Sequence, residues 1–221
     1  MIKICHLADS HIRNLKFHKE YRIIFQEIFD TLKEEKPDYI VHCGDIAHTK
    51  TQISPEFVEM CAWFFRSLAE VAPTYIILGN HDGNLKNSSR QDALTPIANA
   101  LSLPNLHLLK DAGEVHLTDD LALNVLSVFD EDNWEKISND NKINIALYHG
   151  SVSGVKTDSG FTMEYGDHDI GIFKGFDYVM LGDIHKTAQA ISYKTVERIV
   201  DEDELDFYIK NGYEIKEVIE G

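Results

Sequence analysis

Short apolar runs alternate with helically spaced apolar residues along the first third of the chain, and this pattern predicts strands and helices in regular succession. The predicted elements are, in order, a strand over Ile2–Ala8, a helix over His18–Glu35, a strand over Tyr39–Cys43, a helix from Ser54 to about Glu70 and a strand over Thr74–Leu78. Pro37 ends the first helix because proline cannot continue it, and Pro55 favours the start of the second. The pattern predicts a β-α-β-α-β unit.

The rest of the chain contains shorter apolar runs around a polar segment from Asp130 to Lys142. The strands predicted there lie at Leu106–Leu109, Glu114–Leu117, Leu121–Phe129, Ile143–Tyr148 and Tyr178–Leu181. A strand over Lys194–Val200, a helix over Asp201–Asn211 and a strand over Tyr213–Ile219 are predicted to end the chain. We therefore expect a domain over residues 1–190, with a β-α-β extension over 191–221.

Alternating strands and helices are typical of an α/β fold, and they favour a sheet that helices cover on both faces. In such folds the functional site lies in the loops beyond the carboxyl ends of the strands. This expectation directs the search for functional residues to the segments that directly follow each apolar run.

Composition adds four limits to this picture. The 221 residues, 43% of them apolar, are enough for one substantial core. No apolar run approaches the roughly 18 residues of a membrane span, and no leader precedes the first strand, so we expect a soluble, cytoplasmic protein without membrane contact. The formal net charge of −16 opposes a nucleic-acid function unless basic residues gather locally. Cys5, Cys43 and Cys61 are an odd count and are expected to be free thiols.

Polar residues follow five of the predicted strands directly. They are Asp9 and His11, then Asp45, then Asn80, His81 and Asp82, then His149, and last Asp183 and His185. A glycine precedes Asp45, Asn80 and Asp183 and permits a sharp exit from each strand. A lone histidine or a Gly-Asp pair is most often an ordinary core or turn residue, but five such sets at successive strand ends favour one site.

The donor types in these segments indicate a metal site. Imidazole, carboxylate and amide groups without cysteine suit manganese, iron, zinc or magnesium rather than a thiolate site. If the strands are neighbours in one sheet, their five loops converge on one rim. The sequence therefore predicts a metal centre at this edge of the sheet.

The same residues resemble the signature motifs of the calcineurin-like metallophosphoesterases. The motifs are Asp9-Ser10-His11, Gly44-Asp45, Gly79-Asn80-His81-Asp82, Tyr148-His149-Gly150 and Gly182-Asp183-Ile184-His185. The resemblance spans about Ile2 to Lys186. Within the family, the chain is similar to the SbcD-type DNA exonucleases, which work in double-strand-break processing. It implies a β-sandwich core flanked by helices, with the active site at the carboxyl ends of the strands.

The resemblance also implies which residues bind metal. One divalent ion would be held by Asp9, His11, Asp45 and His185, and the other by Asp45, Asn80, His149 and Asp183. Asp45 would bridge two ions that activate a bridging water for in-line attack on phosphorus. The family commonly has histidine where this chain has Asp183, and this exchange favours harder metals. We expect two Mn²⁺ ions, with Mg²⁺, Fe²⁺ and Zn²⁺ as alternatives.

Two further histidines and a set of basic residues complete the predicted site. The resemblance implies that His81 binds no metal and instead stabilises the transition state or protonates the leaving oxygen. His48 is predicted to contact His81, with a solvated loop position as the alternative. Basic residues that follow the motifs could bind the phosphates of the substrate, namely Arg13, Lys50, Lys86, Arg90, Lys156 and Lys186.

Three functions are compatible with these residues. The leading one is a metal-dependent DNA nuclease, exonucleolytic or endonucleolytic; a phosphodiesterase of small nucleotides and a non-catalytic scaffold are the alternatives. DNA is the expected partner, and the branch implies an SbcC-type coiled-coil ATPase subunit, although no docking segment is readable after Lys186. A homodimer is left open.

Overall fold

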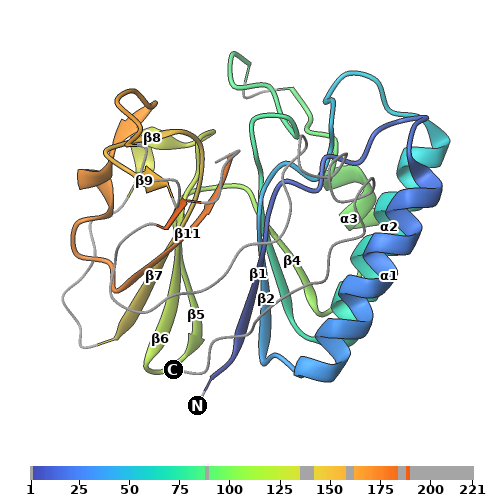
Figure 1. Cartoon of the computed structure of the whole chain (residues 1–221), viewed down its shortest axis with the longest axis horizontal. Coiled ribbons are helices and arrows are strands. Elements are labelled where there is room, and N and C mark those ends of the chain that lie inside the picture. The colour runs from blue at the N-terminus through green and yellow to red at the C-terminus, as the bar shows by residue number, and fades with distance from the viewer. Residues whose placement is uncertain (1, 88–89, 135–141, 158–161, 184–187, 190–221) are drawn as a thin grey trace.

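Two four-stranded sheets lie face to face at the centre of the molecule (Figure 1). The computed structural model describes residues 2–87, 90–134, 142–157, 162–183 and 188–189. The first sheet is parallel throughout, in the order β1 (Ile4–Leu7), β2 (Tyr39–Cys43), β3 (Thr74–Ile77) and β4 (Leu106–Leu109). The second has the order β11 (Tyr178–Gly182), β7 (Ile143–His149), β6 (Leu121–Leu126) and β5 (Gly113–Thr118), and only β5 runs antiparallel to its neighbour.

Three helices cover the outer face of the first sheet, on the right in Figure 1. They are α1 (His18–Glu35), α2 (Pro55–Val71) and α3 (Thr95–Leu101). Aromatic side chains join α1 to α2, with the rings of Phe25 and Phe64 4.5 Å apart between centroids. The hydroxyl of Ser54 accepts a hydrogen bond from the backbone N–H of Phe57 at 3.1 Å and so caps α2 at its predicted start.

The strands of both sheets are buried on two sides, and this explains their nearly continuous apolar sequences. Between the sheets, Val41, Cys43 and Ile77 pack against Leu123 and the other inward residues of β6 and β7. The outer face of the second sheet packs its own apolar cluster, which includes Tyr148 and Phe173. The short elements in the described part of the chain are η1 (Glu131–Asn133), β8 (Val152–Ser153), β9 (Lys156–Thr157), β10 (His168–Asp169), η2 (Ile170–Phe173) and β12 (Ala188–Gln189).

The strands predicted between Ile2 and Leu181 and the two long helices predicted from apolar spacing are confirmed, with ends that differ by a few residues at most. The prediction of helices on both faces of one sheet is wrong for the described residues, because the second sheet covers the inner face of the first. Helix α3 was not predicted, since its seven residues are too few to show a helical period. The predicted elements at Lys194–Ile219 lie outside the described residues.

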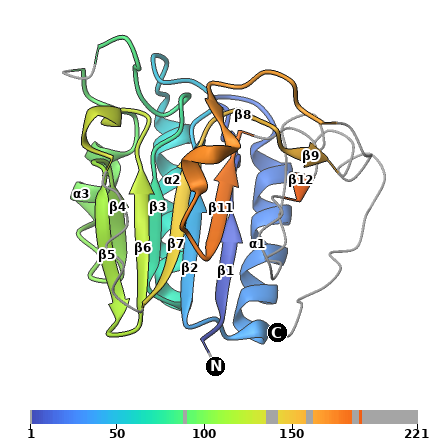
Figure 2. The same cartoon turned by 90° about the vertical axis from the view of Figure 1, so that its left-hand side faces the viewer.

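The carboxyl ends of the parallel strands meet at one end of the molecule. In Figure 2 the arrows of β1, β6 and β11 all point to this end. A backbone hydrogen bond from Asp9 N to Gly44 O, 3.0 Å long, joins the loops after β1 and β2 there. None of the helices in the described part of the chain combines the length and apolarity of a membrane span.

Candidate metal centre

The loops that leave β1, β2 and β11 adopt an unusual backbone conformation. Asp9, His11, Asp45 and Asp183 have φ angles of 55°, 41°, 55° and 69°, in the left-handed region. Aspartate and histidine tolerate this region better than most residues, and such conformations gather at functional sites. The polar side chains on these turns lie close together.

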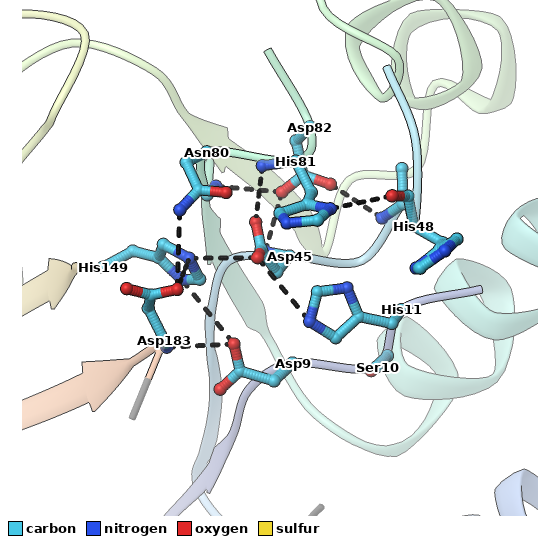
Figure 3. A network of polar contacts seen from close by, with 12 residues as sticks. Asp9, Ser10, His11, Asp45, His48, Asn80, His81, Asp82, His149 and Asp183 are labelled. Carbon is cyan, nitrogen blue, oxygen red and sulfur yellow. Dashed lines mark hydrogen bonds and ion pairs between the residues drawn. The ribbon is translucent and has the colours of Figure 1, made fainter. Parts of the chain in front are cut away.

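Asp45 lies at the centre of this convergence (Figure 3). Its Oδ1 accepts the backbone N–H of His81 at 2.8 Å. Its Oδ2 lies 3.2 Å from Nε2 of His149 and 3.6 Å from Nε2 of His11. One oxygen of Asp45 is therefore committed to the β3 loop, while the other faces two imidazoles that come from different sheets.

Two groups of potential ligands share Asp45. Asp9 and His11 form one group with it, and His149 and Asp183 form the other, and within each group one ligand atom per residue lies within 4.8 Å of the others. Asn80 lies beside the second group, with Nδ2 3.4 Å from Oδ1 of Asp183. These are the two sets predicted from sequence, except that His185 lies outside the described residues.

His149 is oriented as a metal ligand would be. Its Nδ1 lies 2.6 Å from the carbonyl oxygen of Cys43, and because a carbonyl only accepts hydrogen bonds, Nδ1 carries a proton. Its Nε2 therefore points at the carboxylates, where it is fully buried and makes no well-directed hydrogen bond to a described residue. Ligating histidines commonly donate the other ring N–H to a backbone carbonyl, so this arrangement fits a cation beside Nε2.

Protons can balance the charge of this cluster in place of cations. Burial raises the pKa of Asp9 to about 6 and lowers the pKa of His11 to about 4. Burial disfavours charge on Asp45 too, but pairing with His149 outweighs it and holds the pKa of Asp45 at about 2. Burial likewise disfavours charge on His149, yet the surrounding carboxylates, Asp45 foremost, raise its pKa to about 10. A proton on His149 thus supplies the positive charge that the carboxylates require.

We expect Mn²⁺ binding to release about one proton from His149 at neutral pH, because a ligating imidazole must be neutral. A group whose pKa is about 10 is protonated at pH 7, so the apparent Mn²⁺ affinity should rise by up to about tenfold per pH unit between about pH 6.5 and 8.5. Calorimetric titrations in two buffers with different heats of ionisation measure the protons released. A binding heat that is the same in both buffers would contradict the proton on His149.

Glycine is required where the two sheets touch behind the ligands. A Cβ atom on Gly44 would lie 2.7 Å from Gly79 N and 2.7 Å from His149 Nδ1. A Cβ atom on Gly182 would lie inside van der Waals contact of the Cys43 carbonyl oxygen and 2.5 Å from His149 Nδ1. The glycines that precede the ligands therefore allow close backbone approach as well as a sharp turn.

Replacing Gly182 by alanine is expected to displace both the Cys43 carbonyl and the His149 ring that it orients. The overlap should cost about 1–3 kcal/mol of unfolding free energy. The misplaced ring should lower Mn²⁺ affinity by about ten- to hundredfold. Thermal unfolding and metal titration measure the two effects. Gly171→Ala is the control, because its Cβ would meet only a movable carboxylate oxygen of Asp169 at 2.9 Å; equal effects of both changes would refute the argument.

His81 and His48 lie beside His11 on the open side of Asp45. Nδ1 of His81 donates to the carbonyl oxygen of His48 at 2.8 Å, so Nε2 is the ring nitrogen that remains for other contacts. The predicted contact between the two residues is present, but the backbone of His48 makes it. Their rings lie 6.0 Å apart between centroids.

Asp82 is a positioning residue whose separate role was not predicted from the sequence. Its buried carboxylate accepts backbone N–H groups from Asp45 at 2.8 Å, Ala47 at 2.7 Å and Gly79 at 2.9 Å. These bonds tie the loop after β2 to the loop after β3, and so set where Asp45 and His81 lie. Its place in the same glycine-flanked turn as Asn80 and His81 was the available signal.

Among the predicted phosphate-binding residues, Lys50 contacts a ligand loop directly. Its ammonium donates to the carbonyl oxygen of Asn80 at 2.7 Å. Arg13 lies over the ring of Phe17, and Lys86 and Arg90 are exposed in the loop after β3. The side chain of Lys156 and all of Lys186 lie outside what the structure describes.

Comparison with known proteins agrees with this geometry. The sequence model of the family described as Calcineurin-like phosphoesterase matches residues 2–187. An uncharacterised protein of Acanthamoeba polyphaga mimivirus is 42% identical over 207 residues, which are 87% of this chain and 15% of that protein.

Two more distant relatives carry functional names. The DNA double-strand break repair protein Mre11 of Methanococcus maripaludis is 26% identical over 240 residues, covering 96% of this chain and 61% of that protein. A subunit of the nuclease SbcCD of Staphylococcus epidermidis is 26% identical over 220 residues, covering 83% of this chain and 57% of that protein. The chain thus spans less than two thirds of the length of each of these relatives.

The nuclease MPE of Pseudomonas putida is among the solved structures to which this chain is similar. The alignment has a TM-score of 0.35 and 17% sequence identity, and it covers 66% of this chain and 61% of the other.

Proposed function

This chain belongs to the calcineurin-like phosphoesterase family, a family of metal-dependent hydrolases, and we propose that its substrate is the phosphodiester backbone of DNA. The observation that carries metal-dependent hydrolysis is the position of Asp45 Oδ2 between the Nε2 atoms of His149 and His11. Two cations that lie close together repel each other, and an anion between them reduces this repulsion. A carboxylate shared by two ligand groups can provide that anion.

Some residues of the site would bind the metal ions, and others would take part in the reaction. Asp9 and His11 would hold one ion and His149 and Asp183 the other, with Asp45 shared by both groups. When bound, the ions supply positive charge for the phosphate oxygens and acidify the attacking water. His81 presents Nε2 from the neighbouring loop, and when both ring nitrogens are protonated its Nε2–H can donate a proton to the leaving oxygen.

Two observations support DNA over a small nucleotide. The relatives named for DNA break repair and for nuclease activity are similar to this chain over most of its length. Exposed cations follow the ligand loops, so a local phosphate track could exist on a protein whose formal net charge is −16. The enzyme of small nucleotides is the second candidate, because the same ligands would serve either substrate.

The deciding assay compares three substrates with the purified chain and Mn²⁺: labelled linear DNA, a chromogenic phosphodiester and a chromogenic phosphomonoester. We expect hydrolysis of the first two and little of the third. Hydrolysis of the small diester alone would favour the small-nucleotide enzyme. No hydrolysis by a protein that binds two metal ions would favour a scaffold.

Changing Lys86 and Arg90 together to glutamine is expected to weaken DNA binding and to lower its salt dependence by about one counterion per removed cation. Hydrolysis of the small diester should be unchanged, because both side chains are exposed in the loop after β3. Binding measured across a series of salt concentrations gives the slope. Lys33→Gln is the control, since Lys33 is exposed in the last turn of α1. An unchanged salt slope would show that Lys86 and Arg90 do not contact the phosphates of DNA.

A further inference from the structure

We propose that His11, His48 and His81 form an alternative cation seat that selects Zn²⁺ over Mn²⁺. Each of the three residues offers one ring nitrogen, and these nitrogens lie within 4.8 Å of one another. The ring centroids are 4.9 Å apart for His11 and His81, 5.9 Å for His11 and His48, and 6.0 Å for His48 and His81. The three rings surround one space beside Asp45 (Figure 3).

The backbone prepares one of these nitrogens for a cation. Nδ1 of His81 donates a hydrogen bond to the carbonyl oxygen of His48, so in the neutral ring Nε2 has the lone pair that a metal needs. The His81 ring stands nearly perpendicular to that of His11, at 82°, as rings arranged around a shared ion often do. His48 and His81 are partly exposed, whereas His11 is buried, so the two outer rings have room to turn toward the inner one.

The distances are compatible with zinc after a small closure. Zinc binds histidine nitrogen at about 2.0–2.1 Å in tetrahedral geometry, which places ligand nitrogens roughly 3.3 Å apart. Nitrogens already within 4.8 Å must approach by about 1.5 Å at most, and side-chain rotation of His48 and His81 can supply this movement. Three protein ligands leave a fourth position for water.

Donor chemistry separates this seat from the carboxylate seat beside it. Asp9, His11 and Asp45 offer two carboxylates and one imidazole, which suits Mn²⁺ or Mg²⁺. Three imidazoles without a carboxylate suit Zn²⁺ and the later transition metals. Because His11 belongs to both groups, the two seats share a ligand residue, and we expect the donor preference of the metal to decide which seat an ion takes.

A consequence follows for activity, and it rests on the proposed function. An ion bound by these three rings would take a ring nitrogen of His81, the residue assigned to the leaving oxygen. Zinc should therefore inhibit the hydrolysis of a small phosphodiester by the Mn²⁺-loaded protein.

The test compares metal affinities in the intact chain by calorimetry with Zn²⁺ and with Mn²⁺. His48→Ala should lower Zn²⁺ affinity by about ten- to hundredfold and leave Mn²⁺ affinity within about twofold. Asp9→Ala should do the reverse. Co²⁺ gives a second readout, because its visible absorption is stronger in a tetrahedral nitrogen site than in a six-coordinate oxygen site, and His48→Ala should weaken that absorption.

His116→Ala is the matched control, since His116 is an exposed histidine on β5. Equal losses of Zn²⁺ and Mn²⁺ affinity in His48→Ala, or no loss of either, would overturn the proposal. Thermal unfolding of each variant excludes a loss of fold as the cause. The affinity comparison uses no substrate, so it decides the zinc seat even if DNA hydrolysis fails.

Discussion

Replacing Asp45 by alanine is expected to abolish hydrolysis and to remove both metal ions together. Oδ2 of Asp45 lies 3.2 Å from Nε2 of His149 and 3.6 Å from Nε2 of His11, so both groups of ligands lose their common oxygen. Metal ions contribute several kcal/mol to the transition state, so the rate should fall by several powers of ten. Calorimetry with Mn²⁺ and an assay on the small diester measure the two losses.

Asp45→Asn separates charge from shape. The amide oxygen can still accept the backbone N–H of His81, a bond of 2.8 Å in the parent, so the loop after β3 should keep its position. The missing negative charge should nevertheless weaken both ions. An Asn variant that retains two tightly bound ions would show that Asp45 does not bridge them, and the assignment of ligands would have to be rebuilt.

Replacing His81 by alanine is expected to lower turnover by roughly two to four powers of ten while both metal ions stay bound. Nδ1 of His81 is committed to the His48 carbonyl, and the two ligand groups that share Asp45 do not need the ring. Metal titration and steady-state kinetics on the same preparation test both halves of this expectation. Loss of an ion in His81→Ala would refute the separation of roles.

The leaving group distinguishes protonation from other functions of His81. A nitrophenolate is a good leaving group and needs no proton. The sugar alkoxide of DNA is a poor leaving group and must be protonated as it leaves. If Nε2 of His81 donates that proton, His81→Ala should impair DNA hydrolysis much more than hydrolysis of a nitrophenyl diester. Equal losses on both substrates would instead indicate charge stabilisation, which both reactions need. His116→Ala should change neither rate.

The strands and long helices were predictable because their information is local. Helix α1 was predicted at His18–Glu35 and found there, since apolar spacing and Pro37 mark its face and its end. Helix α3 escaped because Asp92 defines its start through hydrogen bonds to Leu94 N at 2.9 Å and Thr95 N at 2.6 Å rather than through a repeated pattern. The pairing of the last strands into a second sheet depends on contacts between distant segments.

The sequence by itself determined the types of the site residues and their places at strand ends, because a metal requires particular donor atoms and a strand directs the chain. Only the tertiary structure decided which atoms meet. It directs Oδ2 rather than Oδ1 of Asp45 toward the two histidines. It places the His48 carbonyl oxygen where Nδ1 of His81 can donate to it. It also brings three backbone N–H groups to the carboxylate of Asp82, which accepts hydrogen bonds from them. These contacts join residues from separate loops, and their geometry follows from the packing of two sheets, which no local pattern encodes.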